Sequence, residues 1–266
     1  MTRKASAFNR AAVALGLAFL YLPIAVLVIG SFNASRLAAA WGGWSTRWYG
    51  ALAADAPLRE ATSTSIRLAL VSATAATIFG TLAAVALTCF MRFRGRALFT
   101  AMLYAPLVMP EVITGLAVLL LFVAVAVDRG FWTVAIAHTT MAMGLVAVIV
   151  QARLIDFDAA LEEAAMDLGA SPLTTFRTVT LPLIAPTVAA GWMLAFALSL
   201  DDLILASFTT APAATTLPIR IYSAVRLGVN PEMNAVCSLM IGGVGLAVIA
   251  ASLLTKLRAT GRMPRP

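Results

Sequence analysis

Long apolar runs dominate the chain and return at intervals along almost all of its length. A membrane-spanning helix needs about 20 mostly apolar residues. Because the runs are too long for strands and lack strict alternation, we expect helices rather than a barrel. The pattern predicts an all-α, polytopic membrane bundle of six transmembrane helices forming one domain over residues 1–266. The expected spans are 11–32, 63–90, 98–127, 132–150, 186–209 and 234–255.

The first apolar segment also has some features of a signal peptide, because Arg3, Lys4 and Arg10 precede it. Its apolar core runs for about 20 residues, whereas the core of a signal peptide runs for roughly 7–15. We therefore interpret the segment as a retained helix.

Composition supports a membrane protein. The chain of 266 residues is 61% hydrophobic and 12% charged, with a mean hydropathy of +0.94. A soluble domain is roughly 45–50% apolar and about 25% charged. The net charge of +7 includes no basic stripe interleaved with aromatic residues, so we expect no nucleic-acid partner. One histidine and two cysteines within apolar runs favour neither a metal site nor a disulfide, and no cofactor is expected.

The distribution of positive charge predicts the orientation. With the N-terminus inside, twelve of the 19 Lys and Arg residues lie on the inner side, and the bias is strongest in the short 91–96 loop. Both termini and the 151–185 loop are therefore expected in the cytoplasm. On the outer side, the stretch 41–50 concentrates Trp41, Trp44, Trp48 and Tyr49. It is interpreted as an interfacial aromatic belt, with a partner contact as the alternative.

The 151–185 loop interrupts the apolar pattern with a polar helix–turn–helix. Asp158 can cap a helix that Gly169 ends in a left-handed conformation. A second helix is expected to begin at Ser171 and Pro172 and to end at Leu181-Pro182, before the fifth span. The first helix has a small apolar face beside an acidic one, which suits close contact with a protein that supplies cations. The apolar face comprises Leu161, Ala164, Ala165 and Leu168, and the acidic one Glu163 and Asp167.

The spacing in this loop resembles the EAA loop of ABC-importer permeases. The pattern reads Glu163-Ala164-Ala165, then Gly169, Val179 and Leu181-Pro182, with Val in place of the usual Ile. The resemblance implies a coupling helix that docks on a separate ATP-hydrolysing subunit. The residues assigned to this contact are Glu162, Glu163, Ala164, Ala165, Asp167, Leu168, Gly169, Leu181 and Pro182.

Three further stretches resemble permeases of the putrescine/spermidine (polyamine) importers: 104–122, 194–208 and 215–235. This resemblance, which extends over roughly residues 10–257, implies the type I (MetI-like) permease fold and a multi-pass place in a bacterial inner membrane. It also implies two ABC ATPase copies, a second homologous permease and an extracytoplasmic solute-binding protein. The implied substrate is a polyamine moved by alternating access.

Three acidic residues fall inside the expected spans: Glu111, Asp201 and Asp202. A charge at mid-membrane costs about 2.5–3.5 kcal/mol on insertion scales, so such a residue usually faces a cavity or a partner. At about 1.5 Å per residue, Glu111 and Asp201 lie roughly 20 Å and 22 Å from the cytoplasmic ends of their spans. The two acids are therefore expected in one layer, and Pro106 and Pro110 are expected to kink the third span.

We interpret Glu111 and one of the two aspartates as lining a cation path, with Trp192 or Phe208 as aromatic walls. The alternative is that one aspartate caps a helix break or pairs with Arg220 or Arg226. His138 is interpreted as a hydrogen-bonded residue of the bundle.

Other function classes are less well supported by the sequence. The chain has no GxxxxGK[ST] phosphate loop, so ATP hydrolysis is assigned to the partner subunit and the chain is not expected to be an enzyme. An ion-coupled carrier remains an alternative, as does an importer of another amine, iron, sulfate or a thiamine-like solute. The sequence does not separate putrescine from spermidine, nor does it identify the partner permease.

Overall fold

The computed structural model describes residues 6–36, 40–90, 92–226 and 231–260. The regular secondary structure in these ranges is helical, apart from an isolated β-bridge between Asn33 and Trp44, and loops join the helices. The all-α prediction is therefore confirmed for the part of the chain that is described. The chain forms two compact units: unit 1 comprises 1–59 and 221–266, and unit 2 comprises 60–220.

Three of the expected spans are continuous helices: α1 (Ala7–Gly30), α3 (Ala56–Cys89) and α6 (Phe131–Ile155). A fourth helical run that is long and apolar enough to cross a membrane covers Pro172–Asp201. The third expected span would bring the number to five, so six spans are not confirmed within the described ranges. The sixth expected segment lies in α12 (Pro231–Thr260), whose C-terminal side chains lie outside the described residues.

The third span is bent, as its prolines predict, and the bend divides it into two helices. It consists of α4 (Arg96–Val108) and α5 (Glu111–Ala124), which meet at an angle of 119°. Pro110 has no backbone N–H to extend the hydrogen bonding of α4, and proline disfavours helical geometry in the residue before it, here Met109. Pro106, in contrast, lies inside α4 without ending it.

The fifth span is also broken, contrary to the expectation of one helix over 186–209. It consists of α9 (Leu181–Asp201) and α10 (Ile204–Thr209), and Asp202 between them has an extended backbone with ψ of 121°. A short 3₁₀ turn, η2 (Pro212–Ala214), and α11 (Leu217–Arg226) follow.

The polar loop forms the expected first helix, α7 (Ala160–Asp167), and its boundaries have the expected chemistry. Asp158 Oδ1 accepts a hydrogen bond from the backbone N–H of Ala160 at 3.1 Å. Gly169 is left-handed, with φ of 87°, and the N–H of Ala170 donates to the carbonyl of Ala165. This bond closes the helix as in a Schellman motif.

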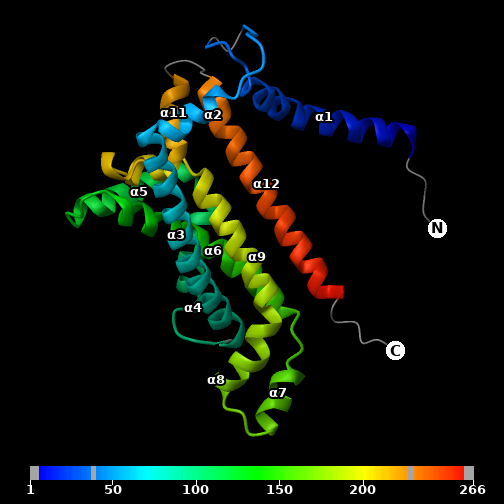
Figure 1. Cartoon of the computed structure of the whole chain (residues 1–266). Coiled ribbons are helices and arrows are strands. Elements are labelled where there is room, and N and C mark those ends of the chain that lie inside the picture. The colour runs from blue at the N-terminus through cyan, green and yellow to red at the C-terminus, as the bar shows by residue number, and fades with distance from the viewer. Residues whose placement is uncertain (1–5, 37–39, 91, 227–230, 261–266) are drawn as a thin grey trace. The chain divides into compact units, whose positions relative to one another are not determined.

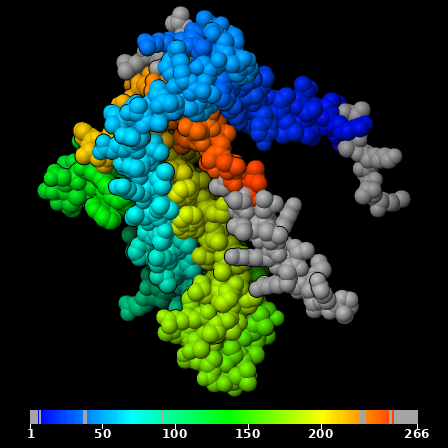
Figure 2. Space-filling view, in the orientation of Figure 1, coloured from blue at the N-terminus to red at the C-terminus, as the bar shows by residue number. Residues whose placement is uncertain are grey.

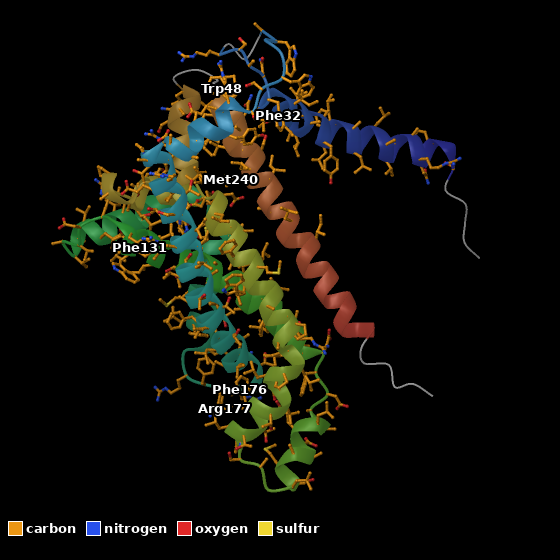
Figure 3. The ribbon with its side chains drawn as sticks, in the orientation of Figure 1. Phe32, Trp48, Phe131, Phe176, Arg177 and Met240 are labelled. Carbon is orange, nitrogen blue, oxygen red and sulfur yellow. The ribbon has the colours of Figure 1, made fainter. Side chains whose placement is uncertain are left out.

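The second polar helix does not stop at Leu181-Pro182 as expected. The short α8 (Pro172–Thr175) continues through η1 (Phe176–Thr180), a π-helical turn, directly into α9. A proline inside an α-helix normally clashes with the carbonyl four residues earlier. The π-turn widens the backbone just before Pro182 and relieves that conflict. Figure 3 marks this junction by Phe176 and Arg177.

Unit 1 is organised around α1, α2 (Arg47–Ala54) and α12, and its aromatic residues pack near the end of α1. The Trp48 side chain is buried and its Nε1 donates to the carbonyl of Asn33 at 2.7 Å. The hydroxyls of Tyr49 and Ser31 are 2.7 Å apart. Trp41 and Trp44, which pack edge to face, stay exposed. Figure 3 labels Trp48 and the neighbouring Phe32.

Unit 2 is built around α3, α6 and α9, which run beside one another with α7 and α8 at one end (Figure 1). Small side chains allow these helices to approach closely, as is usual in membrane bundles. A Cβ on Gly144 of α6 would lie 2.5 Å from the carbonyl oxygen of Leu103 in α4. A Cβ on Gly80 of α3 would lie 2.6 Å from the carbonyl oxygen of Met143 in α6. Backbone therefore packs directly on backbone at both crossings.

Replacing Gly144 by Ala should separate α4 from α6, because the added methyl group meets a backbone atom that cannot rotate away. We expect a loss of about 1–3 kcal/mol, the usual range for overpacking. Thermal unfolding of the purified protein in detergent would measure it. Gly191→Ala is the matched control, since its Cβ would lie 3.4 Å from Val146, an ordinary contact. Equal melting temperatures for the two variants would contradict this account of the crossing.

Candidate functional site

A cavity of about 330 Å³ lies in unit 2 where the two broken spans meet α6. Three of the side chains around it are carboxylates, and most of the others are apolar. Its lining residues are Glu111, His138, Met141, Ala142, Leu198, Ser199, Asp201, Asp202, Leu203, Ile204 and Leu205.

Each carboxylate reaches the cavity from a helix break. Glu111 is the first residue of α5, directly after the bend at Pro110. Asp201 is the last residue of α9, and Asp202 lies between α9 and α10. The structure thus brings together all three acids that the sequence singles out, from segments about 90 residues apart. It does so by ending helices at the acids, a feature that the apolar pattern does not reveal.

Asp202 is the most heavily bonded of the three acids. Its Oδ1 accepts from the N–H of Leu205 at 3.2 Å and its Oδ2 from the N–H of Ala206 at 2.7 Å. These are free donors at the start of α10, so the carboxylate caps the helix break. Asp202 also lines the cavity, and its Oδ2 lies 2.8 Å from Nε2 of His138.

His138 belongs to a buried chain of polar side chains that crosses from α6 to α9 and α3. Its Nδ1 lies 2.7 Å from the hydroxyl of Ser199, and that hydroxyl lies 3.0 Å from the hydroxyl of Ser72. Ser72 in turn donates to the carbonyl of Leu68 at 2.7 Å. Sequence reasoning anticipated a hydrogen-bonded His138 but missed both serines. Single serines in apolar spans give little signal until the fold aligns them.

The predicted aromatic walls lie elsewhere. Trp192 stacks on Phe196 with ring centres 5.3 Å apart and donates from Nε1 to the hydroxyl of Thr74 at 3.1 Å. The ring of Phe208 packs over Gly115 of α5, at the position that a Cβ there would occupy. Neither aromatic residue lines the cavity, because each is engaged by a neighbouring helix within unit 2.

The proposed arginine partners are likewise not paired with the aspartates in the described contacts. Within unit 2, Arg220 makes no ion pair with Asp201 or Asp202 among the described residues. In unit 1, the guanidinium of Arg226 lies 4.5 Å from the ring centre of Tyr222.

Most residues assigned to ATPase contact lie at the tip formed by α7 and α8, which Figure 2 shows as a protruding lobe, whereas Leu181 and Pro182 begin α9. Leu168 is 91% exposed, and Leu161, Met166 and Leu173 are also exposed. The tip thus combines free apolar side chains with three acidic ones. Of the assigned residues, Glu163, Ala164, Asp167, Leu168, Gly169, Leu181 and Pro182 are exposed, while Glu162 and Ala165 are partly buried.

Glu162 has a structural contact of its own. Its carboxylate accepts a hydrogen bond from the hydroxyl of Thr180, which is buried in η1. This contact ties α7 to the helical run that leads into α9.

The cavity can bind cations by charge and by hydrogen bonding. Carboxylates accept from ammonium groups, and the apolar part of the lining can accommodate a hydrocarbon chain. Such a mixture suits a flexible organic cation better than a metal ion. The described residues hold no cluster of three or more metal-binding side chains.

Comparison with known proteins places these features in one family. Residues 76–258 match the family model described as the inner membrane component of binding-protein-dependent transport systems. Over 238 residues the chain is 54% identical to the putrescine transport system permease protein PotI of Escherichia coli (strain K12), covering 87% of this chain and 85% of that protein. It is 41% identical over 244 residues to the spermidine/putrescine transport system permease protein PotC of the same strain, covering 92% of each chain.

Solved structures show the same fold at much lower identity. The chain matches a bacterial ABC transporter involved in the import of the acidic polysaccharide alginate, with 17% identity and a TM-score of 0.71, covering 96% of this chain and 99% of that one. It also matches an alginate transporter in complex with a pentasaccharide-bound periplasmic protein, with 16% identity and a TM-score of 0.74, covering 96% and 94%. The family match covers well over half of the sequence, and the chain belongs to the inner membrane components of binding-protein-dependent transport systems.

Proposed function

We propose that the chain is the transmembrane permease subunit of an ATP-driven importer that moves polyamines into the cytoplasm. The observation that carries the proposal is the convergence of Glu111, Asp201 and Asp202 on one cavity of unit 2. In a membrane span, three acids are tolerated only where they meet a cavity or partners, and such residues mark substrate paths.

Polyamines match this lining in both charge and shape. They carry two or more ammonium groups on a flexible hydrocarbon chain. The carboxylates supply acceptors for the ammonium groups, and Leu198, Leu203 and Ile204 supply apolar surface. The names of the two relatives, for putrescine and for spermidine/putrescine, support the same solute class. Another amine would meet the same groups, and the ligand of the cognate binding protein would decide between them.

The tip of α7 and α8 supports docking of a separate ATPase. Exposed Leu168 and Leu173 offer apolar contact, and Glu163 and Asp167 offer negative charge to a cationic cleft. Since the sequence has no phosphate-binding loop, the energy for transport comes from this partner and the chain itself is not catalytic.

An uninterrupted helical run supports a mechanical link between tip and cavity. From Pro172 through η1 to Asp201, 30 residues continue without a break and end at a cavity carboxylate. At about 1.5 Å per residue the run measures roughly 45 Å. Movement of the docked tip is thereby transmitted to the layer that holds the acids, as alternating access requires.

The remaining assembly follows from the orientation and the family. Both termini and the tip face the cytoplasm, with the excess of Lys and Arg. Residues 1–266 act as a single permease domain beside a second homologous permease. Two ATPase copies dock from inside, and a solute-binding protein delivers the polyamine from outside. The periplasmic protein in the alginate transporter complex supports this last contact.

Neutralising two of the acids together should abolish transport. In the double variant Glu111→Gln, Asp201→Asn, the ammonium groups lose two of three counter-charges, so we expect polyamine uptake to fall at least tenfold, equivalent to about 1.4 kcal/mol or more. Labelled putrescine and spermidine uptake into proteoliposomes holding the complete transporter would measure it. Asp128→Asn, an exposed carboxylate outside the cavity, should transport normally. Normal uptake by the double variant would refute the pathway.

Altering the tip should uncouple the permease from its ATPase. Leu168→Asp places a charge on the exposed apolar surface, Glu163→Lys reverses an acid, and Gly169→Pro prevents the left-handed turn. We expect each to reduce co-purification of the ATPase by at least tenfold.

Glu60→Lys is the matched control, because Glu60 is an exposed acid near the start of α3, the end away from the tip. If Glu60→Lys and Glu163→Lys retained equal amounts of ATPase, docking at this tip would be wrong.

A further inference from the structure

The hydrogen-bond directions in the buried chain between α3, α9 and α6 are determined one by one. The carbonyl of Leu68 can only accept, so the 2.7 Å contact uses the single proton of the Ser72 hydroxyl. Ser199 must then donate in its 3.0 Å contact with Ser72. With its own proton used, Ser199 accepts from Nδ1–H of His138 at 2.7 Å.

This chain leaves Nε2 of a neutral His138 with a lone pair. A neutral imidazole carries only one N–H, and the hydrogen bond to Ser199 requires that hydrogen on Nδ1. Nε2 nevertheless lies 2.8 Å from Oδ2 of Asp202. That carboxylate already accepts from two backbone N–H groups, so its oxygens act as acceptors here. Two bare acceptors at this distance repel each other unless a hydrogen is shared between them.

Nε2 also has a hydrogen-bonding direction left open. It is buried, and no hydrogen bond to a described residue satisfies it, although Oδ2 of Asp202 lies 2.8 Å away. His138 is only 4% exposed and lines the acidic cavity. A buried polar atom without a partner is costly, so its place in the cavity wall indicates a ligand that donates hydrogen bonds.

The charged groups around this contact are all acidic. Glu111 faces the cavity from α5, Asp201 from α9 and Asp202 from the break before α10. From α3 the facing group is the uncharged Ser72, and α10 contributes Leu205 and the backbone of Ala206. The titratable hydroxyl that α4 presents to α6, that of Tyr104, donates to Gln151 further along α6 and does not face His138. A cation at Nε2 is therefore favoured by its surroundings.

We propose that the contact between His138 and Asp202 is an exchange site at which a substrate ammonium replaces a proton. Without substrate, an added proton on Nε2 makes His138 an imidazolium opposite Asp202. When an amine arrives, that proton leaves to water, and the ammonium donates one N–H to Nε2 and another to Oδ2. One positive charge leaves and another enters, so the charge of the pair is preserved. The inference rests on the proposed function and adds a competition between protons and amines.

The exchange predicts that amine binding releases a proton. We would titrate putrescine into the purified permease–ATPase complex by calorimetry at about pH 6, in two buffers with different ionisation enthalpies. The difference in heat between the buffers gives the number of protons released. Wild type should release close to one proton per amine, because the ammonium replaces the proton on Nε2. The half-saturating putrescine concentration should rise as the pH falls.

Two variants test the mechanism at different points. His138→Gln replaces the titrating ring by an amide that always offers a donor, so release should fall to near zero. Ser72→Ala lies outside the cavity lining and frees the Ser199 proton to bond Nδ1. A neutral ring then carries its hydrogen on Nε2, so release should fall while putrescine still binds. Thr140→Ala is the control, since that exposed α6 hydroxyl bonds only the carbonyl of Ile136.

The outcomes separate this inference from the function on which it rests. If putrescine bound to wild type without releasing a proton, the exchange site would be wrong and the polyamine pathway would stand. The same conclusion would follow if wild type, Ser72→Ala and His138→Gln released equal numbers of protons. Absence of putrescine binding to wild type would overturn both. Binding of tetramethylammonium, which has no N–H to donate, with the same proton release would also contradict the exchange.

Discussion

The need to satisfy backbone groups where helices break inside an apolar bundle underlies the arrangement of unit 2. A break within a span frees N–H groups that lipid cannot bond. At the break between α9 and α10, the carboxylate of Asp202 accepts from two of them. The carboxylate satisfies N–H groups that the break exposes, and those N–H groups supply hydrogen bonds that the carboxylate could not obtain from lipid. At the bend between α4 and α5, Glu111 starts the new helix, where the helix dipole favours its charge.

The two breaks create the cavity because both fall beside the same part of α6. His138 and Ala142 of that helix line it together with the three acids. Close packing elsewhere makes this local opening possible. Gly144 and Gly80 hold α4 and α3 against α6 close to the cavity, so the bundle keeps its contacts where the two spans break. The cavity is thus a local opening in an otherwise tightly packed unit.

The helical run between the tip and the cavity also depends on how a proline is accommodated. Pro182 would ordinarily end a helix, but the π-turn η1 accommodates it and keeps the run from Pro172 to Asp201 continuous. The hydrogen bond between Thr180 and Glu162 ties α7 to that run. The helical run is therefore continuous where the proposed mechanism needs to transmit movement and broken where it needs to bind substrate.

The sequence by itself determined the membrane class, the all-helical fold, the left-handed turn at Gly169 and the three acids of interest. These features depend on composition, on local backbone chemistry or on the cost of charge in lipid, all of which can be read from neighbouring residues. The sequence also predicted a proline kink in the third span, but only the tertiary structure decided that Pro110 breaks it while Pro106 and Pro182 lie inside continuous helices. It alone decided that Trp192 and Phe208 pack away from the cavity. It alone decided that Ser72, Ser199 and His138 form one chain with Asp202. Each of these depends on which helices meet and at what angle. Those contacts join residues up to 127 positions apart, and no local pattern encodes them.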